Sequence, residues 1–571
     1  MRKSRVILLA ALLLAILGVI WLYLGKPAQV DMAIYAPADS LLYLEANKPV
    51  DVAEAIASTE AWRTIGGAVG PLAQAPQNGL LRELISRTGI GPVQSVVLAR
   101  AQVAVVLTDL RTVEEGDTLN IRPEAVLLIE THTRSSRVRP VFESYLKTLA
   151  EKTYVHPTFR RSNIDGVEFL EWLAPENSRQ IVATINDSLI MIGTSEQAVR
   201  KCLATARGSN PNLKGDAEFL RIRTELQGSS TLTFGFVPQN SSPKLLAVGL
   251  PALAGRAPGD AQFQRLIATG AGKIFGSLAW CSRVFKTGIE DRYLIAFQTP
   301  VGTRLKGPFQ FSGRAYDPDQ GLPSKVYSVT SYNFANPLDA WQTLNSTVSS
   351  QVDAFSTIVF SSLLKSSLIS YGIEDPPAFL AATKGPLLTL KLDDADERSL
   401  LIAGVQNRDA LKSLVEKHLS PWPEESRNGV EMFEDSSGEL GAELRDELVI
   451  FGPPEDIRRY DELSGKLKND ELQRLSFFRS TQSEASVVTY SNDADRVRTF
   501  IAAILVAKGL STELSEPNLN AIASLPYSIT ETTLTDQGIE RVTRSPLGQF
   551  SSLFPLLLPT QPANSNGAPS K

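Results

Sequence analysis

Apolar and polar residues follow each other along most of the chain in short segments, some with the spacing of a strand and some with that of a helix. An apolar strand at 125–129 precedes a segment whose apolar residues recur at helical spacing, namely Val138, Val141, Phe142, Tyr145 and Leu146. Such spacing places them on one face of a helix. The same order returns at 399–419, with Leu411, Leu414, Val415 and Leu419. Both segments therefore predict a strand followed by an amphipathic helix.

The resemblance extends well beyond these two segments. Gly166-Val-Glu-Phe corresponds to Gly429-Val-Glu-Met, and Asp187-Ser-Leu-Ile corresponds to Asp446-Glu-Leu-Val. Matching sequences keep the same order throughout, and the offset between them shrinks steadily along the chain. We therefore predict an internal duplication, with one copy at 34–298 and a second at 322–547. The alternative is two unrelated stretches that share common turn sequences.

Short turns rich in Asn, Asp and Gly connect many of the expected strands, as at 163–166 and 427–429. Short connections favour antiparallel pairing, since parallel strands need a long crossover. The predicted fold class is therefore α+β, with helices packed on mixed or antiparallel sheets. Proline and glycine are frequent at 299–321, which we expect to link the copies.

The N-terminus predicts a transmembrane helix. Cations within residues 1–5 precede an uncharged run at 6–24, which as a helix would rise about 28 Å, close to the hydrocarbon thickness of a bilayer. Trp21 and Tyr23 suit the interface, and the run is longer than the apolar core of a cleaved signal peptide. The positive-inside rule places residues 1–5 in the cytoplasm and everything after Gly25, including the 25–33 spacer, on the other side. An atypical cleaved signal is the alternative.

Composition excludes some classes of protein. With 43% hydrophobic and 21% charged residues the chain of 571 residues has globular composition, and its formal charge of -5 disfavours nucleic acid as a partner. Cys202 and Cys281 are the only cysteines, which excludes a Cys-rich zinc site. We expect two buried thiols, with a mutual disulfide as the alternative.

A family resemblance follows from these features together. The features that carry the resemblance are the N-terminal span, the strand opening Ala36-Pro-Ala-Asp-Ser40, the Gly166-Val-Glu and Asp187-Ser-Leu turns and the closing Ser545-Pro-Leu-Gly548. In these features the chain resembles an uncharacterised bacterial family of membrane-anchored extracytoplasmic proteins, defined by a domain of unknown function. The resemblance covers nearly the whole body, through turn and strand sequences. It implies a bacterial inner membrane protein with a periplasmic body, and it supplies no activity, cofactor or site residues.

The sequence contains only partial matches to motifs that carry a specific chemistry. Gly270-Ala-Gly272-Lys273 lacks the spacing of a phosphate loop and is expected to end a helix, while Ser362-x-x-Lys365 has the spacing of a Ser-Lys nucleophile within a Ser-rich helix. The acidic run Asp393-Asp394-Ala-Asp396-Glu397 is expected to form a solvated hairpin tip rather than a cation site. Three histidines, His132, His156 and His418, are too scattered for a locally assembled metal site. No catalytic, cofactor-binding or metal-ligating residue is therefore assigned, and no cofactor is expected.

Positions kept in both copies are mainly glycines, turn residues and apolar faces, which determine the fold. Two polar pairs are also kept, Arg134/Arg408 and Glu143/Glu416, and we expect these side chains to bond backbone or solvent.

Two functions of different classes remain open. The preferred one is a noncatalytic envelope module that binds a protein, lipid or glycan partner. The other is an extracytoplasmic, hydrolase-like enzyme with a site between the two copies. The ligand, the oligomeric state and the orientation of the copies stay undetermined at this point.

Residues 548–571 comprise an apolar stretch and a disordered tail. We expect the apolar stretch to pack on the second copy rather than to dock a partner.

Overall fold

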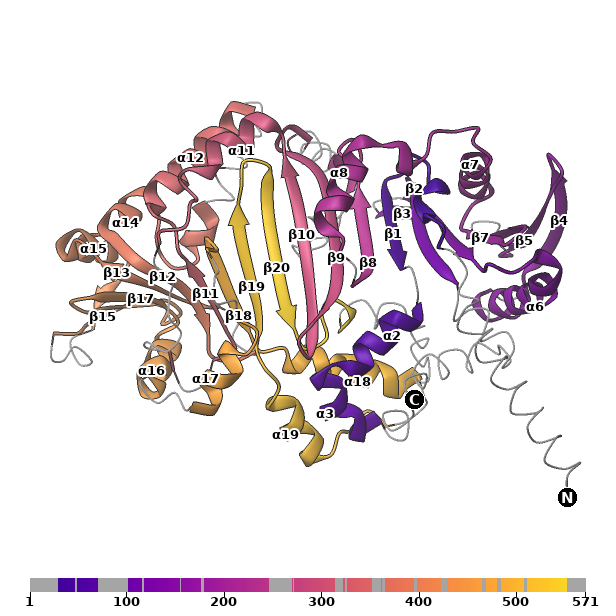
Figure 1. Ribbon diagram of the computed structural model, residues 1–571. Helices are drawn as coiled ribbons and strands as arrows, with labels where there is room; N and C mark the ends of the chain where they lie inside the picture. Colours follow the sequence, from indigo (N-terminus) through magenta and orange to yellow (C-terminus); the bar gives the residue numbers. More distant parts are fainter. Residues whose placement is uncertain are drawn as a thin grey trace, which may run out of the picture. The chain divides into compact units, whose positions relative to one another are not determined.

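The computed structural model describes most of the chain between residues 29 and 551. The described ranges are 29–46, 49–69, 101–115, 118–154, 156–175, 179–228, 230–245, 270, 272–313, 322–323, 326–351, 361, 365–394, 398–422, 429–464, 469–479, 484–507 and 511–551. Helices and antiparallel strands make up these residues, so the fold is α+β, as predicted (Figure 1).

Two compact units divide the chain. Unit 1 comprises Met1–Glu54 and Gln77–Arg223, and unit 2 comprises Ala55–Pro76 and Thr224–Lys571. Within the described residues the chain passes between them at two places, both inside helices, namely α2 (Pro49–Ser58) and α8 (Ala217–Leu226). This division by compactness differs from the division into two similar sequences that the duplication predicts.

Unit 1 contains an antiparallel sheet with the strand order β1–β2–β3–β7–β6–β5–β4. The bounds are β1 Leu42–Ala46, β2 Gln102–Glu115, β3 Thr118–Glu130, β4 Thr158–Ile164, β5 Val167–Leu173, β6 Gln180–Asn186 and β7 Leu189–Gly193. Because β4 pairs only with β5 among the described strands, β4 forms one edge of this sheet (Figure 1).

Two helices cover opposite faces of this sheet. Helix α6 (Ser135–Thr153) buries Leu146 and Ala150 against Leu170 and Trp172 of β5. Helix α7 (Glu196–Ala206) packs on β3, β6 and β7, and its Val199 adjoins Gly193. Successive strand residues point to alternate faces, so the two helices use alternate positions of the same strands. The apolar helical face predicted from Val138 to Leu146 is thereby confirmed.

Unit 2 contains a longer antiparallel sheet, with the order β8–β9–β10–β20–β19–β18–β11–β12–β13–β17–β16–β15–β14. The bounds are β8 Thr231–Val237, β9 Phe275–Phe285, β10 Gly288–Phe297, β11 Ser328–Tyr332, β12 Thr383–Lys391, β13 Leu400–Val405, β14 Ser420–Pro421, β15 Glu431–Glu434, β16 Gly441–Leu444, β17 Leu448–Gly452, β18 Val487–Ser491, β19 Ser528–Leu534 and β20 Gly538–Ser545.

The elements of the two expected copies follow the same order and pairing. The arrangement β1–β2–β3–β7–β6–β5–β4 returns as β11–β12–β13–β17–β16–β15–β14, and β8–β9–β10 returns as β18–β19–β20. The helices that correspond to α6, α7 and α8 are α15 (Arg408–Val415), α16 (Pro454–Leu463) and α17 (Asn469–Ser476). The two parts of the chain thus share one order of strands and helices.

The final strands of the two expected copies pair with each other, so that β10 lies beside β20 (Figure 1). Arg292 is opposite Val542, and these residues occupy equivalent positions when Gly288 is aligned with Gly538. The pairing therefore has local pseudo-two-fold symmetry about this residue pair, as in the isologous interface of a homodimer. At Gly538 a Cβ atom would lie 2.1 Å from the carbonyl oxygen of Ile295, so the close approach of the strands requires glycine.

Helix α3 (Glu60–Val69) comes early in the sequence but belongs to unit 2. It packs against α18 (Ala494–Ala507) and α19 (Glu516–Ala523). The rings of Trp62 and Phe500 meet nearly edge-on, with centroids 6.4 Å apart. An N-terminal helix thus completes a cluster formed by C-terminal helices.

The first part of the expected linker is a packed helix. Residues Thr299–Lys306 form α11, which buries Val301 and Leu305 and packs against α12 (Pro337–Gln351). The two buried residues are four positions apart and so share one face of the helix.

The expected transmembrane segment, 6–24, lies outside the described residues. Among the residues that are described, no helix has the length and hydrophobicity needed to cross a membrane.

Both cysteines are free and buried, as the sequence led us to expect. Burial raises the pKa of Cys202 to about 12 and that of Cys281 to about 11, which keeps both thiols protonated.

Candidate functional site

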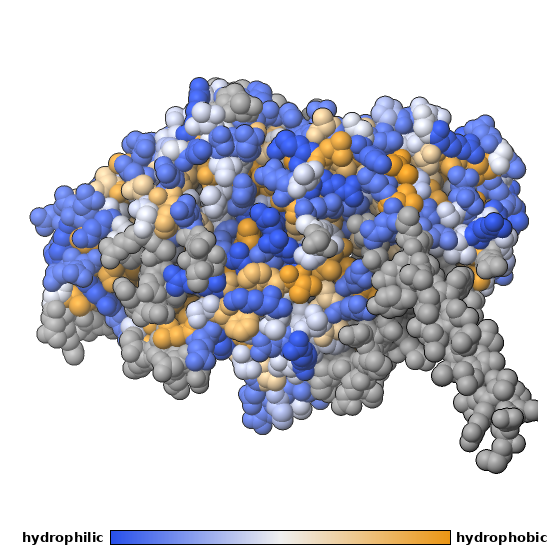
Figure 2. Space-filling model, in the orientation of Figure 1, coloured by the Kyte–Doolittle hydropathy of each residue, from blue (hydrophilic) through white to orange (hydrophobic). Residues whose placement is uncertain are grey.

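A groove of about 1170 Å³ runs between α6 and the β4–β5 hairpin, at the free edge of the sheet of unit 1. We call it the α6–β4 groove. Its lining residues are Pro140, Glu143, Ser144, Lys147 and Glu151 from α6, and His156, Pro157, Phe159, Arg161, Leu170 and Trp172 from the hairpin and the loop before it. In the space-filling view this end of unit 1 is mainly hydrophilic, with hydrophobic residues exposed among the polar ones (Figure 2).

The hairpin is fixed by its turn. Asp165 and Gly166 both have positive φ, 50° and 74°, which is the conformation of a two-residue type I′ turn. The turn sets the register, so that Phe159 is opposite Trp172 and Arg161 is opposite Leu170. Side chains directly opposite each other point to the same face. The strand therefore directs Phe159 and Arg161 into the groove.

Aromatic and aliphatic side chains form the floor of the groove. Trp172 is buried, whereas Phe159 is 49% exposed, an unusual exposure for so large an apolar side chain. Their ring centroids lie 5.1 Å apart, and the guanidinium of Arg161 lies 5.8 Å from the centroid of Phe159. The Phe159 ring is thus held in place on one side while a large part of it remains open to a ligand.

Ion pairs join the helix to the hairpin beside the groove. Arg161 contacts Glu143 and Glu168, both at 3.1 Å, and Arg139 contacts Glu168 as well. The second expected copy has the same connection, because Lys412 of α15 contacts Glu431 of β15 at 2.6 Å. These pairs hold helix and hairpin at a fixed separation.

The expectation that the polar positions kept in both expected copies bond backbone or solvent holds only in part, since Arg408 donates to the backbone carbonyl of Gly429 at 3.5 Å. Glu143 forms an ion pair rather than bonding only backbone or solvent, and Arg408 pairs with Glu431 at 2.7 Å. Helical spacing alone does not show that a carboxylate on the next strand lies within reach.

The groove is developed in only one of the two expected copies. Helix α6 extends over Ser135–Thr153, whereas its counterpart α15 ends at Val415. The counterpart of β4 is β14, which consists of Ser420–Pro421 alone. Beside it, the guanidinium of Arg458 lies 4.8 Å from the ring centroid of Trp422. The first copy thus has a long helical wall and a long edge strand that are absent from the described part of the second.

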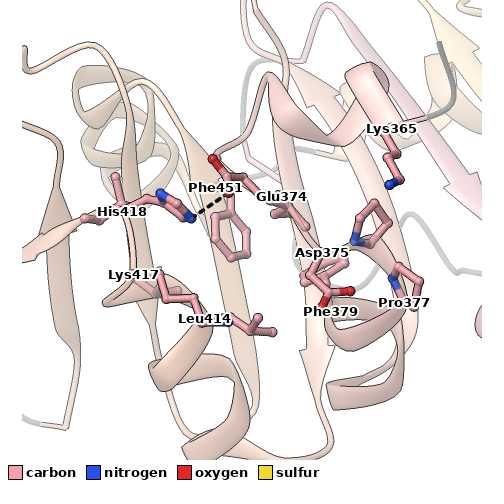
Figure 3. A pocket seen from close by; sticks show the side chains of 14 residues that line it. Lys365, Glu374, Asp375, Pro377, Phe379, Leu414, Lys417, His418 and Phe451 are labelled. Atoms are coloured by element: carbon pink, nitrogen blue, oxygen red, sulfur yellow. Dashed lines mark ion pairs between the residues drawn. The ribbon is translucent and has the colours of Figure 1, made fainter. Parts of the chain in front are cut away.

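A second cavity, of about 390 Å³, lies in unit 2 between the end of α15 and the start of α14 (Pro376–Ala382). His418 Nε2 lies 3.3 Å from Glu374 Oε2 on one side, with Lys365 across the cavity (Figure 3). Phe379 and Phe451 form the apolar part of its lining. The structure therefore brings together two residues that the sequence singled out separately, whereas Ser362 lies outside the described residues.

The other candidate residues occupy separate places. His132 Nε2 lies 3.1 Å from Gln102 Oε1, and His156 lines the α6–β4 groove. Gly272 and Lys273 are in the last turn of a helix that ends at Ile274, directly before β9, as expected for a helix end. Asp393 and Asp394 lie between the paired strands β12 and β13, as expected for a hairpin tip, and 395–397 lie outside the described residues. Across the described ranges no group of three His, Cys, Asp or Glu side chains could hold a metal ion.

Comparison with known proteins found no match for this chain among protein-family models, curated proteins or solved structures.

The groove itself was not anticipated from the sequence. A signal was present, since Arg160-Arg161 and Ser420-Pro421, which pair with equivalent residues of β5 and β15, differ completely in character. A difference of this kind between two copies indicates a position released from the shared requirements of the fold.

Proposed function

We propose that this protein is a noncatalytic, membrane-anchored envelope module that binds its partner in the α6–β4 groove. The observation that carries this proposal is the open aromatic floor at the free edge of the sheet, found in one copy of an otherwise repeated topology. Binding sites are concave, with apolar floors and a few polar groups at fixed positions. The groove has both features.

The charged residues of the groove favour binding over catalysis. Arg161 and Glu143 pair with each other, and Lys147 lies 3.9 Å from Glu151 one turn further along α6. Side chains engaged in this way position the walls of a groove.

The proposal includes the cellular setting inferred from the sequence. Residues 6–24 would anchor the chain in the bacterial inner membrane, with residues 1–5 in the cytoplasm and the duplicated body in the periplasm. The matching strand orders of the two copies support a duplicated body, and the resemblance to an anchored extracytoplasmic family supports the location.

An enzyme is the second candidate, and the cavity around His418 favours it. A histidine beside a carboxylate, with Lys365 across an apolar cavity, is a combination that can move protons. The cavity lies within the second copy rather than between the two. Loss of a hydrolytic activity of the purified chain on replacing His418 with alanine would support this candidate.

Photo-crosslinking in intact cells tests the binding proposal. A benzophenone amino acid at Lys147, whose side chain is 69% exposed in the groove, should give one defined adduct with an envelope component. The same label at Arg498 of α18, which is 53% exposed outside the groove, is the matched control and should give no such adduct. Identical adduct patterns at both positions, or none at either, would count against the groove as the binding site.

The same cells test the anchor. Deleting residues 6–24 should release the body from the membrane fraction. The intact chain should stay with the membrane after washing at high salt. Added protease should digest the body of the intact chain only once the outer membrane is opened. A full-length body protected from that protease would contradict the proposed topology.

A further inference from the structure

The edge of β4 presents backbone groups that no described strand uses. In a hairpin with a two-residue turn, the residues that flank the turn exchange both of their hydrogen bonds, and every second residue before them does the same. Ile164 is paired with Val167 in this way. The N–H and C=O groups of Phe159, Arg161 and Asn163 therefore point away from β5, toward the free edge.

Edge strands of this length are normally shortened or blocked, since their free backbone groups can pair with another chain. The second copy follows this rule, because β14 has two residues and one of them is Pro421, which cannot donate a backbone hydrogen bond. In β4 residues 158–161 are all exposed. The contrast between equivalent strands indicates that the edge in the first copy is kept open.

The charge of β4 indicates whether its edge pairs with a second copy of this chain or with a different partner. The strand contains Arg160 and Arg161 and no acidic residue. If two copies of the chain paired through antiparallel β4 strands centred on their middle residue, Arg161 would face Arg161, and like charges directly opposite each other destabilise a sheet. Arg161 is already paired with Glu143 and Glu168, whereas Arg160 has no ion pair among the described residues, so the preference for an acidic partner rests mainly on Arg160.

The two faces of an added strand would meet different surroundings. Side chains on one face would enter the α6–β4 groove and contact Phe159, whereas those on the other face would lie beside Arg160. An apolar residue suits the first environment and a carboxylate the second.

We propose that an extended segment of a partner protein, with alternating apolar and acidic residues, adds as a further strand to the free edge of β4. Main-chain hydrogen bonds to the outward groups of β4 would provide affinity, and the apolar side chains in the groove would provide specificity. This inference rests on the groove being the binding site proposed above, and it names the chemical class of the partner.

A substitution at Asn163 tests strand addition separately from the fold. Proline there removes an outward N–H group and leaves the β4–β5 hydrogen bonds intact, because Asn163 is not one of the residues bonded to β5. The probe is a labelled, capped Val-Glu-Val-Glu-Val-Glu-Val peptide, whose fluorescence anisotropy is measured with the full chain in nanodiscs. We expect Asn163→Pro to weaken binding at least tenfold with an unchanged melting temperature, and Asn163→Ala to bind like the wild type.

A charge reversal tests the acidic specificity. Arg160→Glu should weaken binding of this peptide about tenfold and strengthen binding of the corresponding Val-Lys peptide.

No binding of the Val-Glu peptide to the wild type, or equal binding by the wild type and Asn163→Pro, would overturn strand addition. If the crosslink from position 147 forms in cells and persists in Asn163→Pro, the groove is used by another ligand such as a glycan, and only the further inference fails. If that crosslink never forms, the proposed function fails with it.

Discussion

Replacing Arg223 with alanine is expected to lower the free energy of unfolding by about 3–5 kcal/mol. The guanidinium of Arg223 donates to Glu45 Oε1 at 2.8 Å and to Asp31 Oδ1 at 2.7 Å. The Glu45 side chain is 1% exposed, and its other oxygen accepts a hydrogen bond from the buried Tyr43 hydroxyl at 2.7 Å. Without Arg223 the carboxylate of Glu45 would remain buried without its counter-charge, which is the costly outcome for a buried ion pair.

Chemical denaturation of the purified body measures this effect, and hydrogen exchange locates it. The loss should appear as faster exchange in β1 and α8, which carry Glu45 and Arg223. Arg160→Ala, at an exposed position of β4 in the same unit, is the matched control and should change stability by less than about 1 kcal/mol. Adding Glu45→Gln to Arg223→Ala should restore part of the loss, because the unpaired charge is then removed. Equal stability of Arg223→Ala and the wild type would rule out this account of the network.

Lowering the pH from 8 to 4 is expected to stabilise the wild type by about 2.5 kcal/mol relative to Asp291→Asn. The pKa of Asp291 is raised from 3.8 to about 6, mainly by burial and to a smaller extent by the charge of Glu290, while hydrogen bonds from the Ser282 hydroxyl and the Gln549 backbone N–H oppose the shift. Since the pKa in the folded state exceeds that in the unfolded state, folding favours the protonated acid. The contribution of Asp291 is therefore fully present below about pH 4 and is lost as the pH rises through 6.

The difference between the two proteins, measured by denaturant titration at several pH values, isolates this group from the other carboxylates. Glu290 is held by Arg283 and Arg544, at 2.5 and 2.8 Å, in both proteins, so its contribution cancels. A difference that is independent of pH would show that Asp291 does not titrate in this range.

The Asp291 cluster also explains the C-terminal segment. The Gln549 backbone N–H donates to Asp291 Oδ2 at 2.8 Å, and its side-chain amide donates to Ser282 Oγ at 2.6 Å. Leu547 and Ser551 are buried. The described part of the apolar stretch thus packs on the body, as expected, but it does so partly on β9 and β10 of the first copy. Residues 552–571 lie outside the described residues.

Local patterns in the sequence were sufficient to predict most of the elements. The helical spacing of Val138, Phe142 and Leu146 predicted α6, and the Asp and Gly residues at 165–166 and 187 predicted turns that have positive φ. These features depend on neighbours within a few positions of the same segment. The α+β class followed from them because short turns favour antiparallel pairing.

Other features depend on partners that are distant in the sequence. Nothing in the periodicity of α3 indicates that it packs on α18 and α19, and nothing in β10 indicates that its neighbour is β20. The α6–β4 groove depends on the separation between a helix and a strand, which ion pairs such as Arg161–Glu143 fix only in the folded state. The sequence therefore identified the elements but not this site.

The membership of α3 in unit 2 bears on how the molecule can be assembled. Under the proposed topology residues 1–5 stay in the cytoplasm and the body is exported from its N-terminal end, so α3 crosses early, whereas α18 and α19 arrive only when nearly all of the body has passed. Its apolar face, including Trp62, must meanwhile remain uncovered or be shielded by something else. Maturation of this unit is thus expected to await the end of export, and secretion stalled before residue 494 should leave a form sensitive to proteases and dependent on chaperones.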